Sequence, residues 1–308
     1  MITAPDPVSS LLSRPFTSDE ATSLGLDYRT LLRENVARVS RGLYVPGDGE
    51  PSVRDRLRAH LAVSADAWAS HRSAAAVQGL WLPESSSDHS LLHLSRPMDA
   101  PRVRRTGVVG HRVRVEDGEV EVLQDGLRVS SPSRTWLDLA HELGPASLVA
   151  LGDQLIRSPR PEFEGREYPF ATKGELVELL KAHPNMRGIV KARAALQSMR
   201  VGADSVPETL LRLSLLAYHF PEPELQIRLR PFDPLSPSGD LGYRVIQVVL
   251  QYDGAHHLSE EQRLRDLRRD AAFRSAGWVV VIVTADDLRN DFARVRAELR
   301  ALWAKRAA

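Results

Sequence analysis

The stretch Val249-Leu-Gln-Tyr-Asp-Gly254 predicts how the last third of this 308-residue chain folds. It is typical of the end of a β-strand before a glycine turn, and we expect that strand to cover Tyr243 to Tyr252. Successive side chains of a strand point to opposite faces, so Gln251 and Asp253 share one face. Since residues two apart in a strand are separated by about 7 Å, an amide and a carboxylate lie side by side at the strand end.

The elements predicted around this strand alternate between helix and strand. The run Trp278-Val-Val-Val-Ile-Val-Thr284 is typical of a strand buried on both faces. The remaining elements are a helix capped by Asp204 or Ser205 and running to Ala217, a strand over 224–230, a helix over 259–276 and a last helix over 291–305. This order predicts a mixed sheet flanked by helices, and hence an α/β (mixed α+β) fold.

A candidate metal site follows from the acids near the strand end. Asp240 precedes the strand, and a bend or bulge would bring its carboxylate beside Gln251 and Asp253. Oxygen ligands of this kind suit Mg²⁺ or Mn²⁺, which activate water and stabilise a departing phosphodiester oxygen. His256 and His257 follow the turn, where they could orient water, contact phosphate or protonate a leaving group. The alternative is that the Asp-Gly pair is only a favourable turn.

The region from Pro207 to Leu288 resembles the Vsr-like group of PD-(D/E)XK nucleases. The resemblance rests on Glu208 in a helix, Asp240-Leu, Gln251-Tyr-Asp-Gly-Ala-His-His257, Asp266-Leu-Arg-Arg269, Phe273, Gly277-Trp278 and Thr284-Ala-Asp-Asp-Leu288. It covers about a third of the chain. It implies a restriction-endonuclease-like αβββαβ core with a mixed sheet over residues 201–308.

The resemblance also implies roles for individual residues. Asp240 matches the metal-binding aspartate, Gln251 stands where the family usually has a glutamate ligand, and Asp253 takes the final motif position. The catalytic set is then Asp240, Gln251, Asp253, Glu208 and His257, with Mg²⁺ or Mn²⁺ held by Asp240, Gln251 and the main chain of Tyr252. Glu208 would support the metal or its water.

Two positions depart from the family pattern. Gln251 lacks the negative charge of a glutamate, which weakens the attraction for a divalent ion. Ile282 stands where a basic residue is expected on the last core strand. Neither departure affects the predicted fold, so a non-catalytic domain is the alternative to an active nuclease.

The first part of the chain predicts two further domains. Residues 16–45 contain two short helical stretches and two strands around a turn, which indicates either a winged helix or another small α+β unit. This region, with Arg38-Val-Ser-Arg-Gly-Leu-Tyr-Val45, resembles the winged helix of AbiEi-type antitoxins, which binds DNA and represses its own operon. Ser70-His-Arg-Ser-Ala-Ala75 and Ser131-Pro-Ser-Arg-Thr-Trp-Leu-Asp138 resemble the second domain of that family. We therefore expect a winged-helix-like domain over 1–50, an α+β middle domain with a helical linker over 51–200, and the nuclease-like domain over 201–308.

Arginines dominate the predicted contacts with DNA. The expected nucleic-acid-binding residues are Arg38, Arg41, Arg104, Arg105, His256 and Arg269. The arginine-rich stretch 96–114 is equally typical of a solvated pair of strands, and Arg269 of a surface ion pair with Asp266. His71 and His111 are predicted to be ordinary packed or exposed histidines.

The composition restricts the function classes. The absence of cysteine excludes disulfides, thiolate zinc sites and cysteine nucleophiles. No apolar run reaches the roughly 20 residues that span a bilayer, and the first residues lack the pattern of a signal peptide. We expect a cytoplasmic protein without membrane contact, and the net charge of +1 leaves local binding of DNA open.

The sequence leaves three functions open for this chain. The first is a DNA-binding endonuclease in a defence or toxin–antitoxin-like system, with a toxin or another operon-encoded protein as partner. The second is a non-catalytic DNA-binding transcriptional regulator with a degenerate nuclease fold. The third is an interaction scaffold without affinity for nucleic acid.

Overall fold

The computed structural model describes residues 6–31, 33–47, 49–160, 164–254 and 260–306. The chain divides into two compact units, each of which contains two separate stretches of sequence. Unit 1 comprises residues 1–143 and 173–193, and unit 2 comprises residues 144–172 and 194–308. Over the described ranges, no helix is both long enough and apolar enough to cross a membrane.

Unit 1 begins with a small α+β region. Its elements are α1 (Pro7–Leu12), β1 (Phe16–Thr17), α2 (Ser18–Ser23), α3 (Tyr28–Leu31), β2 (Val36–Ser40) and β3 (Leu43–Pro46). The three strands form a sheet in the order β1-β3-β2, and a capping box between Thr17 and Glu20 begins α2. The predicted order of helix, helix and hairpin is confirmed, and its assignment as a winged helix stays a prediction.

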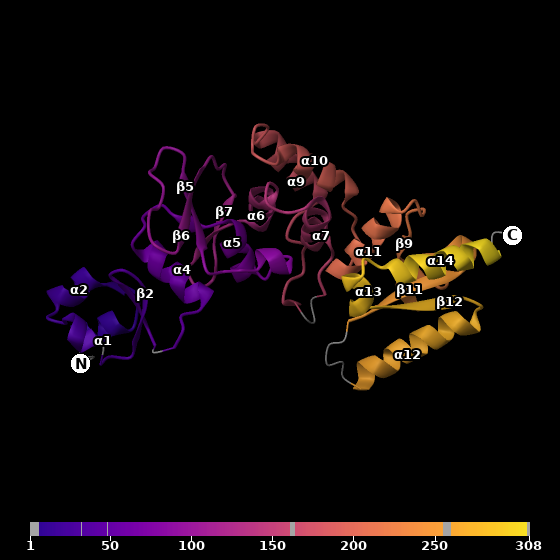
Figure 1. Ribbon diagram of the computed structural model, residues 1–308, viewed down its shortest axis with the longest axis horizontal. Coiled ribbons are helices and arrows are strands. Elements are labelled where there is room, and N and C mark those ends of the chain that lie inside the picture. Colours follow the sequence, from indigo (N-terminus) through magenta and orange to yellow (C-terminus); the bar gives the residue numbers. More distant parts are fainter. Residues whose placement is uncertain (1–5, 32, 48, 161–163, 255–259, 307–308) are drawn as a thin grey trace. The chain divides into compact units, whose positions relative to one another are not determined.

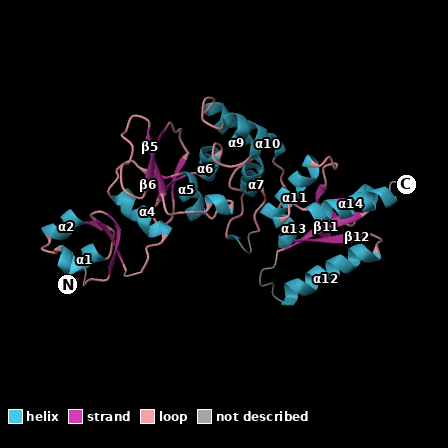
Figure 2. Cartoon of the chain, viewed as in Figure 1, coloured by secondary structure: helices cyan, strands magenta, loops and turns pink. Residues whose placement is uncertain are grey.

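The rest of unit 1 surrounds a mixed five-stranded sheet (Figure 2). Its elements are α4 (Val53–Ala62), β4 (Trp68–Ala69), α5 (His71–Gln78), η1 (Glu84–Ser86), β5 (Leu92–Pro97), β6 (Val108–Val113), β7 (Val120–Val122), β8 (Arg128–Ser130), α6 (Pro132–Leu139) and α9 (Lys173–Ala182). The strand order is β6-β5-β4-β8-β7. Arg134 of α6 is 1% exposed and donates to the carboxylates of Asp138 and Glu119. This buried ion network ties α6 to the strand region around β7.

Unit 2 contains a four-stranded mixed sheet between helices. Its elements are α7 (Pro145–Ile156), the end of α10 (Ile189–Ser198), α11 (Val206–Ala217), β9 (Glu224–Arg228), β10 (Ser238–Tyr243), η2 (Arg244–Ile246), β11 (Val248–Asp253), α12 (Glu260–Ser275), β12 (Val279–Thr284), α13 (Ala285–Arg289) and α14 (Ala293–Arg306). The strand order is β12-β11-β10-β9, with β11 and β12 parallel and the other pairs antiparallel. The predicted α/β fold class with a mixed sheet is confirmed.

The helices of unit 2 cover both faces of this sheet. Leucines of α11 and α14 pack with Leu241 and Leu250 in one apolar cluster. Phe273 of α12 packs with Val249 and Trp278 in another cluster. Figure 1 shows α14 and α12 on opposite sides of β11 and β12. Because Val249 and Leu250 point to opposite faces, neighbouring residues of one strand contribute to the two clusters.

One predicted element is wrong. The strand expected from Tyr243 to Tyr252 is interrupted by the short 3-10 turn η2, after which Gln247 has φ +47°. This turn contains no Gly, Pro, Asn or Asp, so the residues that usually mark a turn are missing from its sequence. As a consequence, Asp240 lies on β10, the antiparallel neighbour of β11, and needs no bulge to approach the end of β11.

A buried aspartate of α7 fixes α11 in place. Asp153 is 1% exposed and accepts hydrogen bonds from Thr209 Oγ1 (2.8 Å), Arg212 (3.0 Å) and the main-chain nitrogen of Arg200 (2.7 Å). Close packing helps, since a Cβ on Gly152 would lie 2.5 Å from the sulfur of Met199. The first turns of α11, which carry Glu208, are therefore held by a chain segment about 50 residues earlier.

Candidate functional site

A cavity of about 560 Å³ in unit 2 collects most of the predicted catalytic residues. Of the predicted residues, it is lined by Glu208, Asp240, Gln251, Tyr252, Asp253 and Arg269. These residues come from α11, β10, β11 and α12, and they meet where β11 ends. The structure thus brings the predicted acids and the amide together, whereas His256 and His257 lie outside the described residues.

Asp240 is placed beside the end of β11 by the pairing of β10 with β11. Towards the end of β11, the last pair of residues in register is Leu241 of β10 and Leu250 of β11. Beyond them, Asp240 Oδ2 accepts a hydrogen bond from the main-chain nitrogen of Tyr252 at 2.7 Å. Burial raises the pKa of Asp240, with the hydrogen bond from Tyr252 acting in the opposite direction. The carboxylate that the metal hypothesis needs is therefore next to the proposed main-chain ligand.

Gln251 is a buried polar side chain of the cavity whose amide makes no hydrogen bond to the described residues. It is 2% exposed, and neither its amide oxygen nor its amide nitrogen has a hydrogen-bond partner among the described residues. A Cβ on Gly239 would lie 2.9 Å from Gln251 Nε2, so the glycine leaves room for the amide. An unpaired buried amide costs roughly 1–3 kcal/mol, and a ligand that takes its oxygen as a donor atom would offset that cost.

Glu208 occupies the third position of α11, where it takes part in the cap of the helix. Its Oε1 accepts from the hydroxyl of Ser205 (2.7 Å), and its Oε2 accepts from the main-chain nitrogen of Asp204 (2.9 Å). Burial raises the pKa of Glu208 to about 8, and the nearby carboxylate of Asp240 acts in the same direction. Two carboxyl groups that resist ionisation in one cavity favour a bound cation, because the cation compensates both charges.

The α12 side of the cavity is formed by a charged face of that helix. The residues that line it recur at intervals of three or four: Arg263, Asp266, Leu267, Asp270 and Arg274, with Arg269 beside them. Arg269 forms ion pairs with Asp266 (2.9 Å) and Asp270 (3.5 Å), which confirms the predicted pair with Asp266. Arg263 and Arg274 are exposed, and are the arginines of this face best placed to meet a phosphate from solvent, although Arg274 also pairs with Asp270 at 3.6 Å.

Sequence reasoning missed three basic residues of the cavity, Arg160, Arg263 and Arg274. Arg160 lies in a stretch rich in proline, glutamate and arginine, a composition typical of an exposed loop or linker. In the structure it lines the cavity and pairs with Asp204, next to the cap of α11. Only a tertiary contact reveals this role, because the two residues are 44 positions apart.

The oxygen donors of the cavity fit a hard divalent cation. The apolar side chain of Ile282, on the same cavity, contributes no ligand. Asp240, Gln251 and the main-chain oxygen of Tyr252 supply the ligand types that Mg²⁺ accepts. Ile282 also lines the cavity, directly paired with Gln251 on the neighbouring strand. This position of the cavity is therefore apolar, and the basic residues that line the cavity come from α12 and from Arg160.

The other predicted DNA contacts belong to unit 1. Arg38 and Arg41 are exposed on and beside β2, and Arg104 is exposed in the loop between β5 and β6. Arg105 is partly buried, and its Nε has no hydrogen-bond partner within the described part of the chain. Their role in binding DNA stays a prediction.

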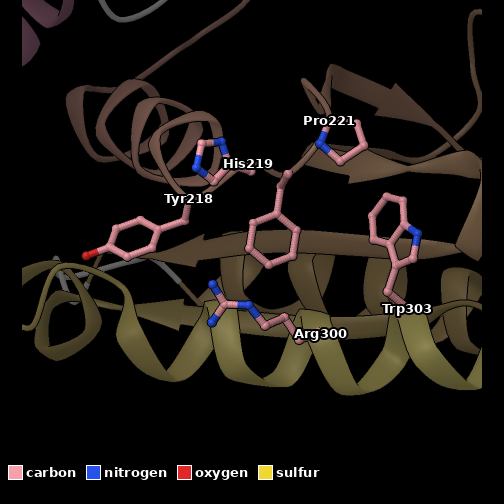
Figure 3. A pocket seen from close by; sticks show the side chains of 6 residues that line it. Tyr218, His219, Pro221, Arg300 and Trp303 are labelled. Atoms are coloured by element: carbon pink, nitrogen blue, oxygen red, sulfur yellow. The ribbon is translucent and has the colours of Figure 1, made fainter.

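A second, smaller cavity of unit 2 has a different character. It has a volume of about 280 Å³ and is lined by Tyr218, His219, Phe220, Pro221, Arg300 and Trp303 (Figure 3). The guanidinium of Arg300 lies 5.4 Å from the ring centre of Phe220, where the aromatic face attracts it. No carboxylate lines this cavity among the described residues, so it does not offer the ligands of a metal-dependent nuclease.

The chain is similar to two curated proteins of Mycobacterium tuberculosis. They bear the names uncharacterized protein MT2308 and uncharacterized protein Rv2248, from strains CDC 1551 and H37Rv, and each is 26% identical to this chain over 266 residues. The similarity covers 86% of this chain and 91% of each relative, so it includes both units. No protein-family model matches the chain.

Proposed function

We propose that unit 2 carries a metal-dependent endonuclease site of the PD-(D/E)XK kind that hydrolyses DNA phosphodiesters. The observation that carries this proposal is the buried, unpartnered amide of Gln251 beside the carboxylate of Asp240. A buried polar group without a partner among the described residues is rare unless a ligand completes it. The raised pKa of Glu208 in the same cavity supports a site that accepts positive charge.

The residues of the cavity take distinct roles in this proposal. Asp240, Gln251 and the main-chain oxygen of Tyr252 would hold Mg²⁺ or Mn²⁺, which supplies charge stabilisation and an activated water. Glu208, fixed by Ser205 and the main chain of Asp204, positions water next to Asp240. Asp253 is exposed at the end of β11 and faces the side from which a phosphodiester arrives.

The arginines of α12 bind the DNA backbone. Arg263 and Arg274 are exposed beside the cavity and bind phosphate oxygens, which fixes the strand without reading its sequence. Arg269 joins them when it leaves its ion pairs with Asp266 and Asp270. Unit 1 adds further DNA contacts through Arg38, Arg41, Arg104 and Arg105.

The setting of this activity follows from the resemblance of unit 1 to AbiEi-type antitoxins. We propose a role in a defence or toxin–antitoxin-like system, in which unit 1 supplies DNA binding and a toxin or another operon-encoded protein is the partner. The chain-wide similarity to the two mycobacterial proteins supports a function that uses both units together.

A non-catalytic DNA-binding regulator is the second candidate, and one observation favours it. Ile282 presents an apolar side chain to the cavity where a basic residue is expected, and its strand partner Gln251 is uncharged. Such a site binds a divalent ion more weakly than a pair of carboxylates would. In this case the cavity would still bind phosphate through α12.

The test is a plasmid-cleavage assay of the full chain with Mg²⁺ or Mn²⁺. Asp240→Asn is expected to abolish cleavage, and Gln251→Glu to increase it because a second carboxylate strengthens ion binding. Asp233→Asn is the matched control, since Asp233 lies in the loop before β10 and pairs only with Arg230 and its own loop among the described residues. Cleavage should persist in this control.

The other outcomes separate the two candidates. DNA binding by the wild type without cleavage under either metal supports the regulator, especially if Gln251→Glu restores cleavage. Cleavage that survives Asp240→Asn would show that another site or a contaminant cuts the DNA. Absence of any DNA binding at low salt would remove both candidates and leave the scaffold.

A further inference from the structure

Four of the ten histidines of the chain gather in unit 1, and none of them belongs to the cavity of unit 2. His71 begins α5, His93 lies on β5, His111 lies on β6, and His141 follows α6 together with Glu142. Residues about 70 positions apart in sequence are therefore brought to one place. The cluster contains four imidazoles and one carboxylate.

The ring nitrogens of this cluster are close to the spacing of metal ligands. His93 Nδ1 and His111 Nε2 are 3.1 Å apart, and the donor atoms of His71, His93 and His111 all lie within 4.8 Å of one another. Zn–N bonds of about 2.0–2.1 Å in a tetrahedral site place neighbouring nitrogens roughly 3.3 Å apart. The rings of His71 and His111 are stacked with centroids 3.9 Å apart, so binding requires these rings to turn.

A polar outer layer orients His71. Ser95 Oγ donates to Ser70 Oγ at 2.7 Å, and Ser70 Oγ lies 3.0 Å from His71 Nδ1. Asp138 Oδ2 lies 3.9 Å from the same nitrogen. With Nδ1 engaged by these groups, Nε2 is left as the ligand atom of His71, which is the arrangement of a metal-binding histidine and its outer partners.

The neighbouring residues of the cluster are fixed in the same way. His141 Nδ1 lies 3.0 Å from the main-chain oxygen of Asp138, and Arg72 Nε donates to Glu142 at 2.8 Å. The donor atoms of His71, His141 and Glu142 also lie within 4.8 Å of one another. His71 is thus shared by two groups of potential ligands.

The backbone of His71 lies in the left-handed region. Its φ is +50°, a conformation that is uncommon outside glycine but that asparagine, aspartate and histidine adopt more readily than other residues, and the residue is 3% exposed.

The residue types of the cluster suit coordination. A neutral imidazole carries a lone pair that a metal ion can bind. Since the chain has no cysteine, histidine and carboxylate are its available ligands for a borderline-soft ion.

We propose that His71, His93 and His111 bind a divalent transition-metal ion of the zinc class, with Glu142 as the neighbouring carboxylate. Three imidazoles select Zn²⁺, Co²⁺ or Ni²⁺ over Mg²⁺, which prefers oxygen ligands. The site is therefore chemically distinct from the oxygen-rich cavity of unit 2. It would link α5 to two neighbouring strands, β5 and β6, of the same sheet.

The test uses the full chain, freed of any affinity tag, stripped with EDTA, loaded with Zn²⁺ or Co²⁺ and dialysed. Zinc is measured by mass spectrometry after gel filtration, and Co²⁺ is followed by its visible absorption. The wild type should retain one Zn²⁺ per chain and give the intense bands of low-coordinate Co²⁺. His111→Gln should weaken Zn²⁺ binding more than the roughly 10–100-fold that loss of an outer partner costs.

Two variants serve as controls for this experiment. His60→Gln removes a histidine that is 2% exposed in the same unit but outside the cluster, and it should keep the ion. Asp240→Asn removes the ligand of the other candidate site and should also keep it. Binding that is lost in Asp240→Asn and kept in His111→Gln would overturn the proposal.

The wild type alone also decides the question. If it retains neither Zn²⁺ nor Co²⁺, the proposal is wrong. If circular dichroism shows that His111→Gln does not fold, the site is tested on the wild type instead. The imidazole signals of its histidines are then followed by NMR. Zn²⁺ must then shift the signals of His71, His93 and His111, and unchanged signals would refute the site.

Discussion

Replacing Glu208 by glutamine should change how the stability of unit 2 depends on pH. Burial, with the help of Asp240, raises the pKa of Glu208 from its ordinary value of 4.5 to about 8. Between these two values the unfolded chain has released a proton that the folded chain still holds. The contribution of the group to stability is therefore complete below pH 4.5 and is lost as the pH rises towards 8.

The size of this effect follows from the pKa. Each pH unit in the interval costs about 1.4 kcal/mol, so the loss across the whole interval is on the order of 5 kcal/mol. Glutamine in Glu208→Gln cannot ionise, and it still offers an oxygen to the hydroxyl of Ser205, although its NH2 group cannot accept from the main-chain nitrogen of Asp204 as Oε2 does. The stability of the variant should therefore change little across the interval, whereas the wild type should lose several kcal/mol between its lower and its upper end.

Hydrogen exchange of α11 peptides at about pH 5 and about pH 8, corrected for intrinsic exchange and measured in EDTA, reports the opening free energy of this helix. The matched control is Glu298→Gln, which changes a partly exposed acid of α14 paired with Arg294. The control should follow the wild type at both pH values. If the wild type is equally stable at both, or if Glu208→Gln loses stability in parallel with it, the buried carboxyl is not the cause.

Three other substitutions test separate parts of the structure. Arg134→Met should lower the unfolding free energy of unit 1 by about 3–5 kcal/mol in urea titrations, because two carboxylates stay buried without the arginine that pairs with them. In the control Arg114→Met, which removes an exposed arginine, the unfolding free energy should change by less than about 1 kcal/mol. Gly188→Ala should lower the thermal midpoint, since its φ is +88° and a Cβ would lie 2.6 Å from a main-chain nitrogen; Gly49→Ala, which has open space, should not. Arg274→Ala should weaken DNA binding in filter assays and reduce the slope of log K against log salt by about 1; an unchanged slope would exclude a phosphate contact.

Elements with a strong local pattern could be predicted from the sequence. The β-branched run that forms β12 and the serine-capped, proline-started helix α6 are examples, because their signals lie within the elements themselves. The turn before β11 could not, since Gln247 adopts a left-handed conformation without any of the usual turn residues. The two-residue strand β4 could not either, because its existence depends on pairing with β5 and β8.

The residues of the candidate site also differ in whether the sequence predicts them. The alternation of β11 and the position of Glu208 in a helix point to residues that the structure places in one cavity, although their catalytic role stays a prediction. Arg160 escapes sequence reasoning because it joins the cavity from a distant segment. The ligand spacing of His71 and His111 escapes it for a related reason, since the two are about 40 positions apart and meet only through the fold.

The contacts of Asp153 on α7 with α11 limit where the chain can be truncated. A fragment that begins at residue 201 would lose Asp153, the buried partner of Arg212, together with the helix α7 that packs against α11. Residues 173–193 complicate any cut further, because they belong to unit 1 although they lie between two stretches of unit 2. A single cut in the chain therefore cannot separate the two units. The protein is best expressed as the full chain.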